Sequence, residues 1–259
     1  RSSDLLSFND LRVKMPGEEV KGAKLEIKRG EIIGIGGLAG QGKIGIANGI
    51  MGLYPCSGEV IYEGKPLKLN DTVHALSSGL VFVSEDRRGV GLLLDTSIEE
   101  NIVVTAMHIQ NQFLHYGLKQ TKKIRTHALK MIKDFDIRCT GPLQVTRRLS
   151  GGNQQKVCVA RALTMNPNVL FVSEPTRGID IGAKKLVLDT LVKLNEELGM
   201  TIVMTSSELA ELRTICDRIA IVCEGRIEGV LQPGDSDADF GLMMSGDYHK
   251  VKGIKGDVS

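Results

Sequence analysis

The sequence contains no tryptophan and has only 4 tyrosines and 6 phenylalanines in 259 residues. Lysine and arginine total 33 against 31 aspartates and glutamates, which leaves a formal net charge of +2. Such a chain offers neither an extended base-stacking surface nor a general attraction for a polyanion. We therefore expect no nucleic-acid partner.

Long hydrophobic runs and paired cysteines are also lacking. No apolar run reaches the roughly 18 residues of a membrane-spanning helix. Residues 1–10 contain neither the positively charged segment nor the apolar segment of a signal peptide. The cysteines are odd in number and form no C-x-x-C pair, so we expect neither a disulfide framework nor a zinc site. This use of cysteine favours a protein of the reducing cytoplasm. The five are Cys56, Cys139, Cys158, Cys216 and Cys223.

The sequence is rich in glycine, with 30 residues, and in alternating strand and helix patterns. Apolar runs and alternation predict strands over Leu5–Val13, Ala23–Ile27, Glu31–Gly36, Ser57–Tyr62, Leu80–Val83, Val169–Val172, Thr201–Thr205, Ile219–Cys223 and Ile227–Leu231. Helical spacing predicts helices over Ile44–Met51, Asp71–Leu76, Gln154–Met165, Ala183–Leu198 and Glu208–Cys216. This rhythm is typical of an α/β protein with a mainly parallel sheet covered by helices.

Residues 97–149 interrupt the alternation with a helical pattern, which predicts a helical subdomain within one domain over residues 1–245. We interpret the lysines of that segment as a solvated helix face. They include Lys122, Lys123, Lys130 and Lys133. Residues 246–259 are polar and predict a frayed tail. The first residue is not methionine and the chain enters a strand pattern at once, so we expect a piece of a longer protein.

A phosphate-binding loop is predicted at Gly37-Leu38-Ala39-Gly40-Gln41-Gly42-Lys43, which fits G-x-x-x-x-G-K between a strand and a helix. Glycines allow successive N–H groups to surround phosphate oxygens, and Lys43 adds a positive point charge. The next residue is Ile44, where this motif carries a hydroxyl that ligates Mg²⁺. The loop therefore predicts nucleotide binding with a weakened metal site.

A second motif is Leu149-Ser150-Gly151-Gly152-Asn153-Gln154-Gln155-Lys156-Val157. Ser150 before a helical run forms an N-capped terminus suited to an anion. The motif resembles the signature sequence of ABC-transporter ATPases, in the form found in importers of simple sugars. The resemblance extends from about Leu5 to Leu231 and implies the ABC-ATPase form of the P-loop NTPase fold, with an N-terminal antiparallel β subdomain and a helical subdomain.

The resemblance implies ATP and Mg²⁺ as cofactors and assigns roles to several further residues. In the family, the positions of Ser150, Gly151, Gly152, Asn153 and Gln154 bind ATP held by a partner domain. The position of Glu174 supplies the catalytic base. Glu85, within Ser84-Glu85-Asp86-Arg87-Arg88, stands at the glutamine position that senses nucleotide, and Ser207 stands where strong ATPases carry histidine.

The sequence departs from the hydrolytic pattern at Ile44, Glu85, Ser173 and Ser207, and residues 14–21 offer no ring for adenine. Loss of one charge-stabilising contact costs about a hundred- to a thousandfold in rate. We therefore expect a degenerate site of its own, weak or no hydrolysis by this domain alone, no metal ligand, and a complete signature that serves a partner.

The resemblance implies a place at the cytoplasmic side of the cell membrane, as the second of two tandem nucleotide-binding domains. The implied partners are the other nucleotide-binding domain, membrane permease subunits and, indirectly, a periplasmic or extracellular sugar-binding protein. Ribose, galactose, xylose and nucleosides remain open as cargo. A non-catalytic regulatory or docking domain is the second hypothesis. A soluble ABC ATPase of DNA repair or translation is the third, although no long coiled coil or strongly basic face supports it.

Overall fold

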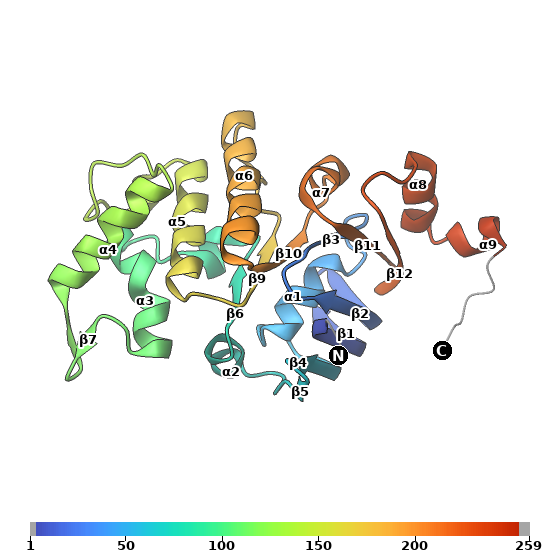
Figure 1. Ribbon diagram of the computed structural model, residues 1–259, viewed down its shortest axis with the longest axis horizontal. Helices are drawn as coiled ribbons and strands as arrows, with labels where there is room; N and C mark the ends of the chain where they lie inside the picture. The colour runs from blue at the N-terminus through green and yellow to red at the C-terminus, as the bar shows by residue number, and fades with distance from the viewer. Residues whose placement is uncertain (1–3, 254–259) are drawn as a thin grey trace. The chain divides into compact units, whose positions relative to one another are not determined.

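The computed structural model describes residues 4–253 (Figure 1). The chain forms two compact units. The first comprises the chain up to Ala75 together with the chain from Leu191, and the second comprises Leu76–Thr190. Two helices cross the boundaries between them, α2 (Thr72–Ser77) and α6 (Ile181–Leu198).

The first unit contains an antiparallel sheet in the order β2-β1-β4-β5. Its strands are β1 (Asp4–Met15), β2 (Glu18–Lys28), β4 (Cys56–Tyr62) and β5 (Lys65–Pro66). In β2 the buried Ala23, Leu25 and Ile27 alternate with exposed residues, the period of a sheet with one face in the core. This sheet is the antiparallel β subdomain predicted for the N-terminal part of the chain.

A second group of strands in this unit has the order β12-β11-β3-β10. The strand β3 (Ile32–Gly36) is parallel to both β10 (Thr201–Thr205) and β11 (Arg218–Cys223), and β12 (Arg226–Leu231) is antiparallel to β11. All residues of β3 and β10 are buried, as expected for central strands covered on both faces. Helix α1 (Lys43–Ile50) follows β3, and α7 (Leu209–Ile215) packs on β3.

The second unit joins a parallel strand pair to a group of helices. The strands β6 (Leu80–Val83) and β9 (Val169–Ser173) pair in parallel, and β9 is buried throughout. The helices α3 (Ile98–Gln110), α4 (Thr121–Asp134) and α5 (Gly151–Thr164) lie beside one another (Figure 1). The short elements are the π-helix η1 (Arg87–Gly91), the 3-10 helix η2 (Thr146–Arg148), and a hairpin of β7 (Leu114–His115) and β8 (Leu118–Lys119), which our sequence interpretation missed.

The end of the described chain differs from the frayed tail predicted from residue 246. Gly246, with φ 77°, ends α8 (Asp237–Ser245), and the chain then turns into a further helix, α9 (Tyr248–Lys252). Lys252 Nζ lies 2.8 Å from Asp239 Oδ1, and His249 Nε2 lies 2.8 Å from the carbonyl oxygen of Glu228. These contacts stabilise a segment whose polar composition predicts disorder. The rest of the predicted tail, residues 254–259, lies outside the described residues.

The α/β class is confirmed, with parallel strands, helices and a separate antiparallel sheet. Predicted and observed elements agree to within a few residues over most of the chain. Asp71 caps α2 as expected, because its Oδ1 accepts a hydrogen bond of 2.9 Å from the N–H of His74. Among the helices of residues 4–253, none has both the length and the apolar character to cross a bilayer.

Candidate functional site

The predicted phosphate-binding loop connects β3 to α1 in the first unit, and its glycines are sterically required. Gly37, Gly40 and Gly42 have φ values of 144°, 73° and 103°, a region that favours glycine. A Cβ atom at Gly37 would lie 2.4 Å from the carbonyl oxygen of Val222, and one at Gly42 would lie 2.5 Å from that of Glu19. Any larger residue at either position would displace backbone.

Lys43 is the first residue of α1, and its side chain is buried in the loop. It is 1% exposed, and its Nζ donates a hydrogen bond of 3.3 Å to the carbonyl oxygen of Leu38. An ammonium group has three donors, so this bond leaves two for another acceptor. Burying a positive charge is costly unless an anion compensates it. The loop glycines and this lysine therefore fit a polyphosphate.

Two neighbouring backbone segments hold the loop in place. The N–H of Gly225 donates to the carbonyl oxygen of Gln41 at 2.8 Å, and the N–H of Glu224 donates to Gln41 Oε1 at 2.7 Å. The N–H of Lys21 in β2 in turn donates to the carbonyl oxygen of Gly225 at 2.7 Å. The loop is thus fixed to the turn between β11 and β12, and that turn is fixed to β2.

A cavity of about 720 Å³ opens beside the loop, between the β1–β2 hairpin and the β11–β12 turn. Its lining is Met15, Gly17, Glu18, Glu19, Lys21, Gly40, Gln41, Glu224, Gly225 and Arg226. No aromatic ring is among these lining residues of the described chain. Charged side chains predominate where a ring would have to lie to stack on a base.

Glu18 is a residue of this site that the sequence interpretation missed. The N–H of Gly40, in the middle of the loop, donates to Glu18 Oε1 at 3.1 Å. The second carboxylate oxygen is buried without a hydrogen bond within the described chain. The Glu18 carboxylate therefore accepts a hydrogen bond from an N–H of the predicted phosphate-binding loop. No local sequence pattern predicts this contact, because it joins residues 22 positions apart.

Ile44, Ser207 and Ser173 occupy three of the four positions at which the sequence departs from the hydrolytic pattern. Ile44 follows Lys43 in α1, is half-buried, and has no oxygen for a metal ion. Ser207 follows β10 in the first unit and is exposed. Ser173 ends β9 in the second unit, and its Oγ is buried without a hydrogen bond in the described chain.

The signature motif lies in the second unit and forms the start of α5. Ser150 is the N-cap, and its Oγ accepts bonds from the N–H of Asn153 at 3.4 Å and from Asn153 Nδ2 at 2.9 Å. Ser150 is exposed, while Gly151, Gly152 and Asn153 are half-buried. The helix start therefore combines an exposed hydroxyl with backbone amides that have no acceptor within the helix, an arrangement suited to an anion.

Gln154 differs from the other four predicted signature residues. Its side chain is 5% exposed, and its Nε2 donates to the carbonyl oxygens of Thr146 at 3.4 Å and Leu149 at 3.3 Å. The amide group thus holds the segment that leads into α5. We infer that Gln154 positions the motif.

Arg87 joins three predicted motifs within the second unit. Its Nη1 donates to the carbonyl oxygen of Gly151 at 3.0 Å, and its Nη2 donates to that of Arg177 at 3.2 Å. Arg87 itself begins η1, directly after Glu85 and Asp86. The guanidinium therefore ties the segment after β6 to the signature helix and to the loop after β9. The position of Arg87 in the sequence does not predict this role, because both contacts join residues far apart in the chain.

Glu174 directly follows β9 and has an unusual backbone. Its φ is 47°, in the left-handed region that residues other than glycine rarely adopt, and it is 9% exposed. Such conformations cost about 1–3 kcal/mol and concentrate at functional sites. The backbone thus places this carboxylate at some cost, and its role as a catalytic base stays a prediction. Glu85, the remaining predicted residue, is half-buried between β6 and η1.

The cysteines give no sign of a nucleophile. All five are free. Burial raises the pKa of Cys56 to about 11 and the pKa values of Cys158 and Cys216 to about 12. These three thiols stay protonated at neutral pH, and a protonated thiol reacts poorly.

Comparisons with known proteins agree with this arrangement. The model of the ABC transporter family matches residues 20–177. The chain is 39% identical over 230 residues to a ribose import ATP-binding protein of Clostridium perfringens, which covers 88% of this chain and 45% of that protein. It is 40% identical over 226 residues to a second such protein, from Rhizobium meliloti, covering 87% of this chain and 43% of that protein. The chain thus spans less than half the length of these relatives.

Solved structures share the fold. The dimeric, post-hydrolysis structure of the ATP-binding cassette MJ0796 bound to ADP and Pi has a TM-score of 0.74 and 26% identity, and covers 89% of this chain and 100% of that one. A nucleotide-free ATP-binding cassette from an ABC transporter has a TM-score of 0.73 with 18% identity, covering 93% and 95% of the two chains. With the family match over more than half of its length, the chain belongs to the ABC transporter family, as an ATP-binding domain.

Proposed function

We propose that this chain drives import of a monosaccharide, ribose in the first instance, by completing the ATP site of a second, similar domain. One contrast supports this proposal. The signature Ser150 is exposed and caps α5, while Ile44 replaces the metal-binding hydroxyl beside the chain's own phosphate-binding loop. The chain is therefore better equipped to bind a partner's nucleotide than to hydrolyse its own.

The own site retains what binds phosphate and lacks part of what hydrolyses it. The loop glycines and the buried Lys43 would hold the phosphates of ATP. ATP itself supplies the phosphoanhydride bond that is cleaved. Glu174 would accept a proton from the attacking water as general base. Ile44 supplies no metal ligand, and Ser207 has no ring to reach the terminal phosphate. We expect the rate of ATP hydrolysis at this site to be well below the rate at the partner domain's site.

The proposed setting follows from the relatives. Their printed names describe ribose import, and the chain matches less than half of each. We therefore place it as the second of two tandem domains at the cytoplasmic side of the membrane, in contact with permease subunits, which receive sugar from a binding protein. Relatives named for ribose favour that sugar over galactose, xylose or a nucleoside.

The test combines the chain with a matching domain that carries an intact metal-binding loop, and measures ATP hydrolysis by the mixture. Ser150→Arg places a long cation where the partner's phosphate would bind, and we expect it to lower the rate about a hundredfold or more. Lys43→Ala removes the lysine of the chain's own site, and we expect it to retain most of the rate. Ser57→Arg, at an exposed strand position, is the matched control for the added arginine.

The ranking of the variants decides the proposal. An unchanged rate with Ser150→Arg would refute the role in trans. A larger loss with Lys43→Ala than with Ser150→Arg would show that the chain's own site does the work. Absence of any ATP-dependent pairing would leave only a regulatory or docking role. Uptake of labelled ribose and of a nucleoside by vesicles containing the complete transporter separates the two kinds of cargo.

A further inference from the structure

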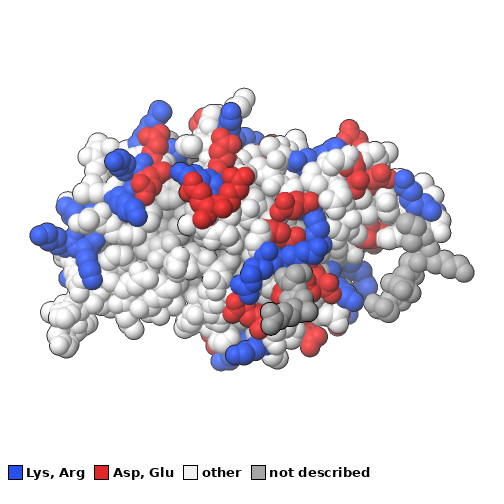
Figure 2. Space-filling view, in the orientation of Figure 1, with Lys and Arg blue, Asp and Glu red and all other residues white. Residues whose placement is uncertain are grey.

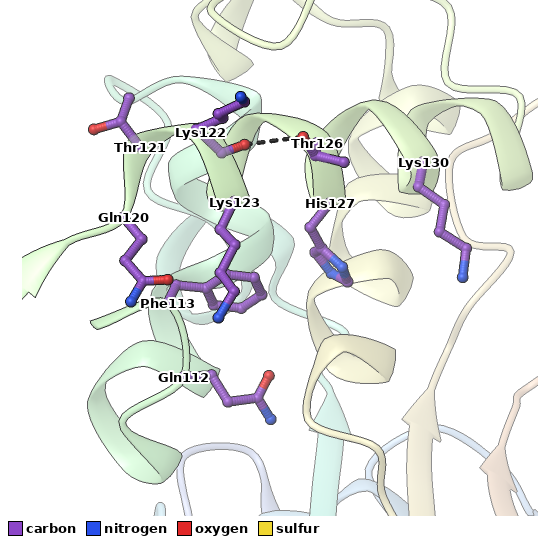
Figure 3. A pocket seen from close by; sticks show the side chains of 9 residues that line it. All are labelled: Gln112, Phe113, Gln120, Thr121, Lys122, Lys123, Thr126, His127 and Lys130. Atoms are coloured by element: carbon purple, nitrogen blue, oxygen red, sulfur yellow. Dashed lines mark hydrogen bonds between the residues drawn. The ribbon is translucent and has the colours of Figure 1, made fainter. Parts of the chain in front are cut away.

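A second cavity lies in the second unit, between α4 and the segment that follows α3 (Figure 3). Its volume is about 940 Å³, within the range of small-molecule sites. The lining residues are Gln112, Phe113, Gln120, Thr121, Lys122, Lys123, Thr126, His127 and Lys130. None of the residues that form the phosphate-binding loop or the signature takes part.

The charges around this cavity have one sign. Three lysines line it, and no aspartate or glutamate is among its lining residues in the described chain. Lys122, Lys123 and Lys130 also form no ion pair with any other described residue. Figure 2 shows lysine and arginine side chains gathered at the left of the view, where Figure 1 places α4.

Some other basic residues of the same region are neutralised by a carboxylate. Arg125, also on α4, pairs with Glu99, and Lys119 Nζ lies 2.7 Å from Glu100 Oε1. The three lysines that line the cavity have no such neighbour among the described residues. A solvated helix face can have an aspartate or glutamate nearby without a cost in free energy. In an anion site, by contrast, a nearby carboxylate would repel the ligand.

Three of the cationic or ionisable side chains lie on one face of α4. Lys123, His127 and Lys130 are spaced i, i+4 and i+7, the repeat that aligns side chains along a helix. In Figure 3 all three project downward from the helix, with Lys123 beside Phe113 and Lys130 farther along the helix, beyond His127. The rings of Phe113 and His127 lie 5.1 Å apart at 49°, which fixes the floor of the cavity beside the charges.

The neutral ring of His127 is held in a defined tautomer. Its Nε2 lies 2.9 Å from Thr164 Oγ1, and that hydroxyl donates its single proton to the carbonyl oxygen of Ala160 at 2.8 Å. The hydroxyl therefore accepts a hydrogen bond from Nε2–H, so Nδ1 is the atom that gains a proton when the ring becomes charged. Burial, and then the charge of Lys130, lowers the pKa of His127. A bound anion would reverse the second effect.

We propose that Lys123, His127 and Lys130, with Lys122 at the rim, form a binding site for a small molecule that carries two or more phosphate groups. Compact ammonium groups suit phosphate oxygens as point charges, and three of them favour a multiply charged ligand. The side-chain amides of Gln112 and Gln120 donate to Gln110 Oε1 and to the carbonyl oxygen of Leu114, and each retains a second N–H at the wall. The site is a second anion site, separate from the nucleotide motifs in sequence and independent of the proposed function.

The experiment uses the whole chain with Lys43→Ala, which removes the lysine of the phosphate-binding loop, and pyrophosphate as the probe. Ring-proton signals of the histidines are followed by NMR, with the His127 signal assigned through His127→Gln. We expect pyrophosphate to move the His127 signal and to raise its pKa, because a neighbouring anion stabilises the charged ring. The signals of His74 and His249, which do not line the cavity, serve as internal references and should stay in place.

A pair of double variants tests the lysines. Lys123→Gln with Lys130→Gln should weaken pyrophosphate binding by at least about tenfold, since the double variant removes two charge-assisted contacts. Lys133→Gln with Lys185→Gln removes the same charge at exposed positions outside the cavity and should change affinity less than about twofold. Equal losses in the two double variants would show non-specific attraction, and a His127 signal that does not respond to millimolar pyrophosphate would equally overturn the proposal. Thermal unfolding of each variant verifies that it folds.

Discussion

The phosphate-binding loop and the signature helix are both built to present backbone amides to an anion, yet they differ in what surrounds those amides. At the loop, Glu18 accepts one amide and Ile44 stands in place of a metal ligand. At the signature, Ser150 is exposed and the carbonyl side of the turn is anchored by Arg87. The first region has a carboxylate and an isoleucine beside its amides, and the second has an exposed hydroxyl. The two regions thus resemble each other in backbone and differ in the side chains beside it.

The largest effect is expected where the loop depends on glycine. Gly42→Ala adds a Cβ 2.5 Å from the carbonyl oxygen of Glu19 at a φ of 103°, and we expect it to lower the free energy of unfolding by about 3 kcal/mol or more. Gly17→Ala is the matched control, because Gly17 has a φ of 78° and open space around it. It should cost about 1–2 kcal/mol, the backbone contribution alone. Equal losses in urea unfolding would show that close packing does not fix the loop.

The second prediction addresses the missing metal ligand. Ile44→Thr restores a hydroxyl after Lys43, and we expect Mg²⁺ to strengthen ATP binding about tenfold in this variant, or about 1.4 kcal/mol. In the unaltered chain we expect ATP affinity to be nearly the same with Mg²⁺ and with a chelator. Ile44→Val, which adds no oxygen, is the control. Titration calorimetry in both solutions measures the difference, and a strong Mg²⁺ effect in the unaltered chain would contradict the inferred impairment.

The third prediction concerns the carboxylate on the loop. Glu18→Gln removes a negative charge beside the N–H of Gly40, and we expect ATP affinity to rise about fivefold, since two like charges about 4 Å apart repel by about 1 kcal/mol in a hydrated site. Glu19→Gln is the matched control, because Glu19 lines the same cavity but lies 3.7 Å from Lys21 Nζ. It should change affinity less. Identical ATP affinities of the Glu18 variant and the unaltered chain would show that the carboxylate moves away from the loop on ATP binding without a cost in free energy.

The smallest effect is expected in the second unit. Arg87→Ala removes two hydrogen bonds to backbone carbonyls, and we expect a loss of about 0.5–1.5 kcal/mol in unfolding free energy, with faster amide exchange at the start of α5. Arg88→Ala is the control, because Arg88 is exposed and forms no hydrogen bond or ion pair with any described residue. If both variants exchange at the same rate, the guanidinium does not hold the signature helix.

Sequence reasoning was sufficient where short-range patterns determine structure. Alternation in β2 and the buried run of β3 predict their strands, and the capping serine predicts the start of α5. It failed where distant segments meet. The Glu18 contact spans 22 positions and the Arg87 bond to Gly151 spans 64, and neither leaves a periodic trace. The β7–β8 hairpin is too short for alternation to reveal it.

The lysines of α4 show a related limit. Their spacing alone fits a solvated face as well as an anion site, since both are polar repeats on a helix. Only the cavity, and the absence of carboxylates from its described lining, separates the two interpretations. The hollow arises from Phe113 and Gln112, which belong to a different element and lie outside the helical repeat.

The attachment of Gln41 to the Glu224–Gly225 turn has a consequence for the rigidity of the loop. One of its two bonds joins main-chain groups, and Gly225 lies too close to Glu19 to accept a side chain. The outline of the loop is thus set mainly by backbone. Substitutions at Glu18 or Ile44 can therefore change what the loop binds and leave its outline intact.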